Sequence, residues 1–192
     1  MGKVLTALVG ALALVTFGSG LASAIPFDVY ALTHSSVING SNLVTGTPLA
    51  TGLFFDNGDS FTATADVDDL WRAGNDVGGV RESNADGLTG LPPHGGSNFG
   101  TVTGSGFTTY FGTLVGRLGT NYFVIGTNYS SGPLVLGGPT QLELFYWDTF
   151  TGDNSGFVTV DIEPVPEPGT LLLLGSGLTG LALRRRARKT RG

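Results

Sequence analysis

The residues with the clearest potential for chemistry form one short polar stretch, WDTFTGDNSG, at residues 147–156. Asp148, Asp153 and Asn154 offer side-chain oxygens, and Gly152 lets the backbone fold so that carbonyl groups point inward. Calcium takes about 6–8 oxygen ligands in a flexible shell, and such a stretch can supply part of one. It therefore predicts a calcium site. The alternative is a polar hairpin turn in which Asp and Asn cap their own backbone amides.

Other chemistries fit the sequence less well. The chain has no cysteine and two isolated histidines, His34 and His94, so a zinc or copper site is not expected. Neither histidine belongs to a recognisable Ser/His/Asp pattern, and no pair of carboxylates has the defined spacing of an acid–base couple. The sequence predicts a binding protein and not an enzyme.

The polar stretch is flanked by two segments that alternate between apolar and polar residues, 141–147 and 157–162, as strands do. Similar patterns occur at 52–55, 60–65, 107–110, 112–118 and 122–125, with a possible edge strand at 27–32. Convincing helical periodicity is confined to the chain ends. Seven to nine short strands predict an all-β protein, a β-sandwich. Residues 66–100 are irregular and are interpreted as one long loop or lid.

The N-terminal end is typical of a secretory signal. Lys3 precedes an apolar run at 4–17, and Ala22-Ser23-Ala24 provides the small residues that signal peptidase requires. We therefore predict a signal peptide at 1–24, with a helical apolar part, and a mature chain that begins near Ile25. A first transmembrane helix is the alternative.

The C-terminal end, residues 165–192, has three parts. Pro166-Glu167-Pro168 is stiff, residues 170–183 carry no charge, and Arg184, Arg185 and Arg186 begin a basic end. This order resembles the PEP-CTERM sorting signal of Gram-negative bacteria. The resemblance implies an apolar sorting helix that enters the inner membrane transiently, cleavage by exosortase, and export to the cell surface or extracellular matrix. An ordinary C-terminal membrane anchor is the alternative.

The mature part of the chain is strongly acidic. Residues 25–164 contain three arginines against 14 carboxylates, a difference of −11. Such a surface repels nucleic acid and anionic lipid, and it suits a divalent cation or a neutral ligand. With no disulfide available, the domain must be held by its core or by a metal.

Three segments carry a second resemblance: LFFDNGDSFTATA (53–65), FGTLVGRLGTNYFVIG (111–126) and LELFYWDTFTGDNSGFVTVDI (142–162). In this order they resemble the calcium-dependent, galactose-binding bacterial lectins of the PA-I type. The resemblance implies a jelly-roll or galactose-binding-like sandwich at 52–164, preceded by an N-terminal extension with strands at 25–51. It also implies one calcium ion in the last hairpin loop, whose coordination shell accepts two sugar hydroxyls.

Carried over by position, the resemblance makes Asp148, Asp153 and Asn154 side-chain ligands, beside a backbone carbonyl from residues 149–151. Thr151 is the nearest counterpart of the family's threonine ligand, although the loop here is shorter. Asp148 and Asn154 would also face the sugar. His94 is a candidate sugar contact or a solvated loop histidine, and Trp147 could stack on a sugar or pack in the core.

These observations predict an exported β-sandwich that binds calcium and carbohydrate. Its expected partners are signal peptidase, exosortase, and an extracellular polysaccharide or galactoside-type glycan. The alternative is a structural matrix protein without metal or sugar binding.

Overall fold

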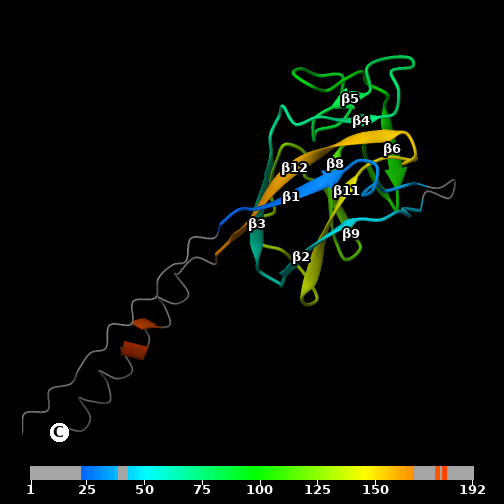
Figure 1. Ribbon diagram of the computed structural model, residues 1–192. Helices are drawn as coiled ribbons and strands as arrows, with labels where there is room; N and C mark the ends of the chain where they lie inside the picture. Colours follow the sequence, from blue (N-terminus) through cyan, green and yellow to red (C-terminus); the bar gives the residue numbers. More distant parts are fainter. Residues whose placement is uncertain (1–22, 39–42, 167–175, 178, 181–192) are drawn as a thin grey trace, which may run out of the picture.

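The structure of the chain, a computed structural model, describes residues 23–38, 43–166, 176–177 and 179–180 (Figure 1). The predicted signal helix and most of the predicted C-terminal helix lie outside these residues. The described part contains twelve strands. They are β1 (Ile25–Tyr30), β2 (Leu49–Phe55), β3 (Ser60–Ala65), β4 (Trp71–Ala73), β5 (Glu82–Ser83), β6 (Thr101–Gly104), β7 (Phe107–Tyr110), β8 (Leu114–Leu118), β9 (Asn121–Val124), β10 (Asn128–Ser130), β11 (Thr140–Tyr146) and β12 (Asn154–Val165).

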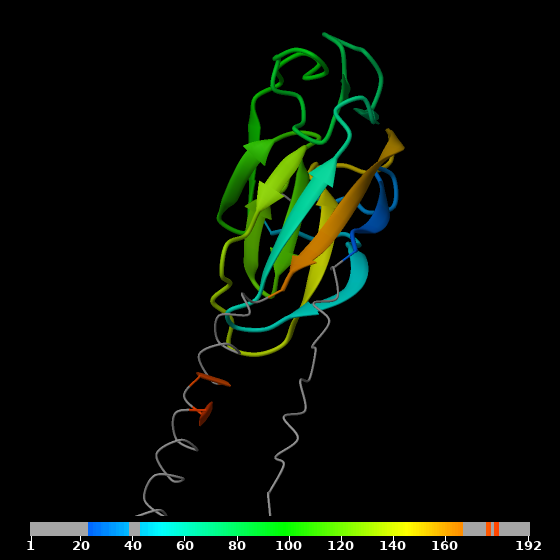
Figure 2. The same cartoon turned by 90° about the vertical axis from the view of Figure 1, so that its left-hand side faces the viewer.

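The strands form two main antiparallel sheets and a separate hairpin (Figures 1 and 2). The first sheet has the order β10-β3-β12-β4-β5, with β1 also paired to β12. The second has the order β2-β11-β8-β9, and β6 pairs with β7 alone. The predicted all-β sandwich is confirmed.

The main core lies between the two sheets and follows the alternation of the sequence. On β3, Phe61, Ala63 and Ala65 are buried while the residues between them are not. On β12 the buried residues are Val158, Val160 and Ile162, while Asp161 is exposed, as predicted. Rings from the two sheets meet in this core: the centroids of Phe55 and Phe61 are 4.8 Å apart.

A second, smaller core lies on the other face of the four-stranded sheet. It contains Ile38, Val115, Phe145 and Trp147, packed against apolar residues that include Val102 of β6 and Phe107 of β7. The β6–β7 hairpin therefore covers the face of the sheet that strand alternation alone would leave to solvent. This explains why Phe145 and Trp147 are buried although they alternate with Leu144 and Tyr146.

The structure differs from the prediction at three places. It has twelve strands in the described residues where seven to nine were expected, because β4, β5, β6 and β10 are only two to four residues long. Residues 66–100 are not one loop, since β4 and β5 lie within them. β1 pairs with β12 over its full length, from Ile25 opposite Ile162 to Tyr30 opposite Phe157, so it is part of the sandwich.

Hydrogen bonds of Asp86 attach the long segment between β3 and β6 to the sandwich. The carboxylate of Asp86 accepts hydrogen bonds from the backbone N–H of Thr127, at 2.8 Å, and from the Thr127 hydroxyl, at 3.0 Å. The backbone of Asp86 also forms an isolated antiparallel bridge with Thr113. These contacts hold β4 and β5 in place beside the start of β12, where the predicted calcium loop lies.

Candidate functional site

The loop that joins β11 to β12 is anchored near its start, at Asp148. The backbone N–H of Asp148 donates to Ser36 Oγ at 2.9 Å, and the Ser36 hydroxyl donates to the Asp148 carbonyl at 2.7 Å. Ser36 also donates its backbone N–H to the carbonyl of Tyr146, at 2.9 Å. The segment after β1 thus fixes where the loop starts. The sequence analysis missed Ser36, since a serine in an unpatterned segment carries no signal.

The carboxylate of Asp148 is buried without a cationic partner. Asp148 is 6% exposed, and no ion pair in the described part of the chain involves it. Oδ1 accepts the backbone N–H of Thr149 at 2.6 Å. Burial raises the pKa of Asp148, the nearby Asp153 charge raises it further, and hydrogen bonds from Thr149, Asn154 and Phe150 partly offset this. A buried carboxylate of this kind is stabilised by any cation that reaches it.

Asn154 lies at the other end of the loop, and its side-chain amide is only partly hydrogen-bonded. Its side-chain amide donates to the carbonyl of Phe150 at 3.0 Å and to that of Ala31 at 3.4 Å. Its Oδ1 is buried and has no hydrogen-bond partner. The carbonyl of Thr151 accepts the Asn154 N–H at 3.1 Å, which closes the turn.

Asp153 is exposed and lies against Gly74, the residue that follows β4. Gly74 has a φ of +81°, and a β-carbon there would collide with the Asp153 carboxylate. The positive φ favours glycine, and a β-carbon would displace the exposed Asp153 carboxylate from its position. The close approach brings the backbone at Gly74 beside a loop that is distant in sequence, and no sequence pattern marked this contact.

Asp148 and Asp153 border a cavity of about 320 Å³ at the end of the sandwich. Two carboxylates and one guanidinium line it together with an apolar wall. The lining residues are Ala73, Arg81, Leu88, Phe99, Phe111, Asp148, Thr149, Phe150 and Asp153. Arg81 and Phe99 could not be predicted as site residues because they lie in the irregular stretch 66–100, and Phe111 lies between two predicted strands without a signal of its own.

The oxygens of the loop fit calcium better than other metals. Asp148 and Asp153 supply carboxylates, and the unpartnered Oδ1 of Asn154 supplies an amide oxygen. The described residues contain no group of three or more metal-binding His, Cys, Asp or Glu side chains. Carbonyl groups and water would therefore have to complete the shell, which calcium accepts and zinc does not favour.

Tyr146 lies close enough to Asp148 and Asp153 to be affected by their charges. It is fully buried, its ring meets Trp71 edge-on with centroids 4.6 Å apart, and its hydroxyl has no hydrogen-bond partner. Burial raises the pKa of Tyr146 well above its usual value, the charges of Asp148 and Asp153 raise it further, and Arg81 lowers it. The Tyr146 hydroxyl therefore stays protonated and keeps an unused hydrogen-bond donor.

The structure places two predicted sugar contacts away from this cavity. Trp147 is fully buried, its Nε1–H donates to the Val102 carbonyl at 3.2 Å, and the Phe107 ring packs on it at 5.2 Å. It packs in the core and has no solvent-facing ring surface for a sugar. His94 lines different pockets, and its Nε2 lies 3.0 Å from Asp68 Oδ1.

The sorting residues follow directly on β12. Pro166 is exposed and comes immediately after Val165, the last strand residue. Glu167, Pro168, Arg184, Arg185 and Arg186 lie outside the described residues. Within the part that the structure describes, no helix is both long and apolar enough to cross a membrane.

Comparison with known families identifies the C-terminal end as a sorting signal. Residues 164–186 match the PEP-CTERM protein-sorting motif. The match contains all the predicted sorting residues, from Pro166 to Arg186. Proteins that carry this motif are exported cell-surface proteins and are processed by exosortase. The PEP-CTERM motif is a sorting signal and has no catalytic role of its own.

A solved structure described as "EclA N-terminal domain; PllA-like lectin" is similar to the chain, with a TM-score of 0.46 and 20% sequence identity. The similarity covers 74% of this chain and 98% of that one. No curated protein sequence matches the chain significantly.

Proposed function

We propose that this PEP-CTERM protein binds calcium in the loop between β11 and β12, and binds carbohydrate of the extracellular polysaccharide in the cavity beside it. The ligands would be the carboxylates of Asp148 and Asp153, the amide oxygen of Asn154, and Thr151 through its hydroxyl or a neighbouring carbonyl. Galactoside-type glycans are the first ligands to examine, on the lectin resemblance.

The calcium proposal is carried by two groups on the two sides of the loop, a buried carboxylate without a cationic partner and a buried amide oxygen without a donor. Asp148 is 6% exposed with no cationic partner among the described residues, and Asn154 Oδ1 is buried with no donor. Buried charges are normally paired or bound to metal, and buried acceptors are normally hydrogen-bonded. One cation between Asp148, Asp153 and Asn154 would satisfy both groups.

The carbohydrate proposal is supported by the composition of the cavity. The lining divides into apolar rings, those of Phe99, Phe111 and Phe150, and charged groups. A sugar ring has apolar C–H faces and a polar rim, so it suits a cavity with this division. The volume of about 320 Å³ is at the small end of the range of ligand pockets, which is appropriate for one or two sugar rings.

The predicted signal peptide and the sorting motif support a role outside the cell. β1 begins at Ile25, directly after the predicted signal peptidase site, so cleavage there would leave the sandwich complete. At the other end, exosortase would act on a motif that begins where β12 ends. The mature domain would therefore be released or retained as a folded sandwich.

Thermal unfolding of the purified full chain in detergent, in millimolar calcium and in excess chelator, tests the proposal. A ligand present at about 100 times its Kd adds about 2.7 kcal/mol, which is a shift of several degrees for a domain of this size. Asp148→Ala and Asp153→Ala should each remove the shift. Asp161→Ala, which removes an exposed carboxylate elsewhere on β12, should retain it.

A calcium response that survives both loop substitutions would place the ion elsewhere. A chain with no calcium response at all would favour the structural matrix protein. Binding of a galactoside should be lost in chelator, and chelator-resistant binding would separate the sugar site from the calcium loop.

A further inference from the structure

Arg81 is the positively charged side chain of the cavity, and it differs from the other two arginines of the sandwich. Arg72 pairs with Asp76 at 2.5 Å and with Glu82 at 3.4 Å. Arg117 pairs with Glu143 at 2.5 Å. Within the described residues Arg81 has no carboxylate at ion-pair distance. In a domain with a large excess of acidic residues, this is an unusual situation for an arginine.

The guanidinium of Arg81 is held over the cavity by other contacts. It stacks on the ring of Phe99, 4.3 Å from the centroid, and one terminal nitrogen donates to the Val77 carbonyl at 3.3 Å. Its Nε is buried and has no acceptor. An unpaired buried donor is costly, and it is more costly when charged. Because no solvent reaches Nε, a ligand in the cavity can contact the guanidinium only at its terminal nitrogens.

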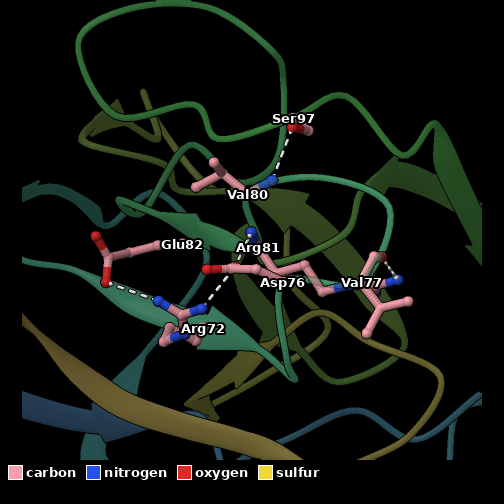
Figure 3. A network of polar contacts seen from close by, with 7 residues as sticks. All are labelled: Arg72, Asp76, Val77, Val80, Arg81, Glu82 and Ser97. Atoms are coloured by element: carbon pink, nitrogen blue, oxygen red, sulfur yellow. Dashed lines mark hydrogen bonds and ion pairs between the residues drawn. The ribbon is translucent and has the colours of Figure 1, made fainter.

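Hydrogen bonds hold the loop that carries Arg81 (Figure 3). Its backbone N–H donates to Asp76 Oδ1 at 2.9 Å, and the N–H of Val80 donates to Ser97 Oγ at 2.9 Å. Asp76 and Glu82, the acidic residues nearest in sequence, are both engaged by Arg72. Both carboxylates are therefore already paired with Arg72, and the guanidinium of Arg81 has no ion-pair partner among the described residues.

The charge of the cavity depends on the metal. Asp148, Asp153 and Arg81 together leave one net negative charge. Calcium in the loop would change this to one net positive charge, which a single carboxylate on the ligand would neutralise. A stacked guanidinium without a carboxylate partner is well suited to a ligand carboxylate, since the two groups can form charge-assisted hydrogen bonds.

We infer that the cavity selects an acidic sugar, and that Arg81 binds its carboxylate. The ligand class is a uronic acid residue of an extracellular polysaccharide. This inference rests on the proposed function, because it assigns the specificity of the same cavity. The inference goes beyond the proposed function because it names the charge of the sugar and the residue that recognises this charge.

The test compares two probes that differ only at C6, methyl β-D-galacturonoside and methyl β-D-galactoside, by titration against the full chain in millimolar calcium. The wild-type chain should bind the galacturonoside at least about tenfold more tightly, the usual effect of one charged hydrogen bond. Arg81→Gln should abolish that preference, so that the two probes bind equally. Arg117→Gln, which removes the same charge outside the cavity, should keep it.

Arg81→Lys provides a second variant that keeps the charge, and it should retain part of the preference. Equal binding of the two probes by the wild-type chain, or binding of neither, overturns the inference without requiring that any variant folds. A preference that persists in Arg81→Gln also overturns it. The calcium shift in the same samples reports on the proposed function separately, so a normal shift without the preference refutes only the role of Arg81.

Discussion

Ile25 lies opposite Ile162 in the antiparallel pair of β1 and β12. The chain therefore enters and leaves the sandwich at the same end, since β12 ends three residues later at Val165. Asn154 begins β12 at its other end, about 36 Å away for a strand of this length. The candidate site and the sorting motif are thus at opposite ends of one strand. A domain tethered through either terminal segment would carry the site on the side away from its tether.

Truncation of the chain after Pro166 should change where the protein accumulates without changing the sandwich. The cut leaves β12 intact, including the pair between Val165 and Ser60, so the calcium shift should be that of the full chain. Cell fractionation should show that the truncated protein is no longer sorted like the wild type. Replacement of Pro166, Glu167 and Pro168 by alanine, with the rest of the tail kept, should have the same effect. Normal sorting of both variants would contradict the assignment of residues 164–186 as the signal that directs sorting.

Trp147→Phe should lower stability and leave ligand binding unaffected. The substitution removes the hydrogen bond to the Val102 carbonyl and part of the contact with Phe107 and Tyr122, for a loss of about 1–3 kcal/mol in the free energy of unfolding. Urea unfolding measures this loss, and the calcium shift and sugar titration measure the site. Loss of sugar binding in a variant that is still folded would restore Trp147 as a ligand contact.

The sequence predicted the main core well because alternation is a local property. Phe61, Ala63 and Ala65 face inward as their spacing requires. The same rule failed for Phe145, which is buried on the opposite face from Leu144. Its burial depends on the β6–β7 hairpin folding over that face, and this is a contact between residues some 40 positions apart in sequence.

The polar loop was also readable from sequence, since Asp148, Asp153 and Asn154 lie within seven residues of one another. The other half of the cavity was not. Gly74 and Arg81 come from a segment without periodicity, and they reach the loop only because β4 pairs with Asn154–Gly156 at the start of β12. Which of three arginines lacks a carboxylate partner is a tertiary property that spacing cannot reveal.

Gly74→Ala should disrupt the calcium loop more than its backbone strain alone would predict. Gly74 and Gly52 both have positive φ, +81° and +73°, so alanine at either position should cost about 1–3 kcal/mol in strain. Nothing lies within 4 Å of a β-carbon at Gly52, whereas one at Gly74 would displace the Asp153 carboxylate. Gly52→Ala is therefore the matched control. The calcium-dependent thermal shift should be reduced in Gly74→Ala and kept in Gly52→Ala, and equal shifts in the two variants would remove Asp153 from the site.

The contribution of Asp148 to the stability of the calcium-free protein should fall as pH rises, because the pKa of Asp148 is raised in the folded state. The folded protein then binds the proton more tightly than the unfolded chain does. The contribution of Asp148 to the free energy of unfolding is largest below its ordinary pKa of 3.8, and it is lost as pH rises through the higher pKa of the folded state.

Urea unfolding of the wild type and of Asp148→Asn in chelator, at several pH values between about 4 and 7, measures this effect. The wild type should lose stability relative to Asp148→Asn as pH rises, since asparagine does not titrate. Asp161→Asn, at an exposed position of the same strand, should follow the wild type. Calcium binds the deprotonated carboxylate, so it should stabilise the wild type most at the neutral end of this range. A wild type and an Asp148→Asn variant with parallel pH profiles would mean that the Asp148 carboxylate is solvated, and its role as a calcium ligand would lose its physical basis.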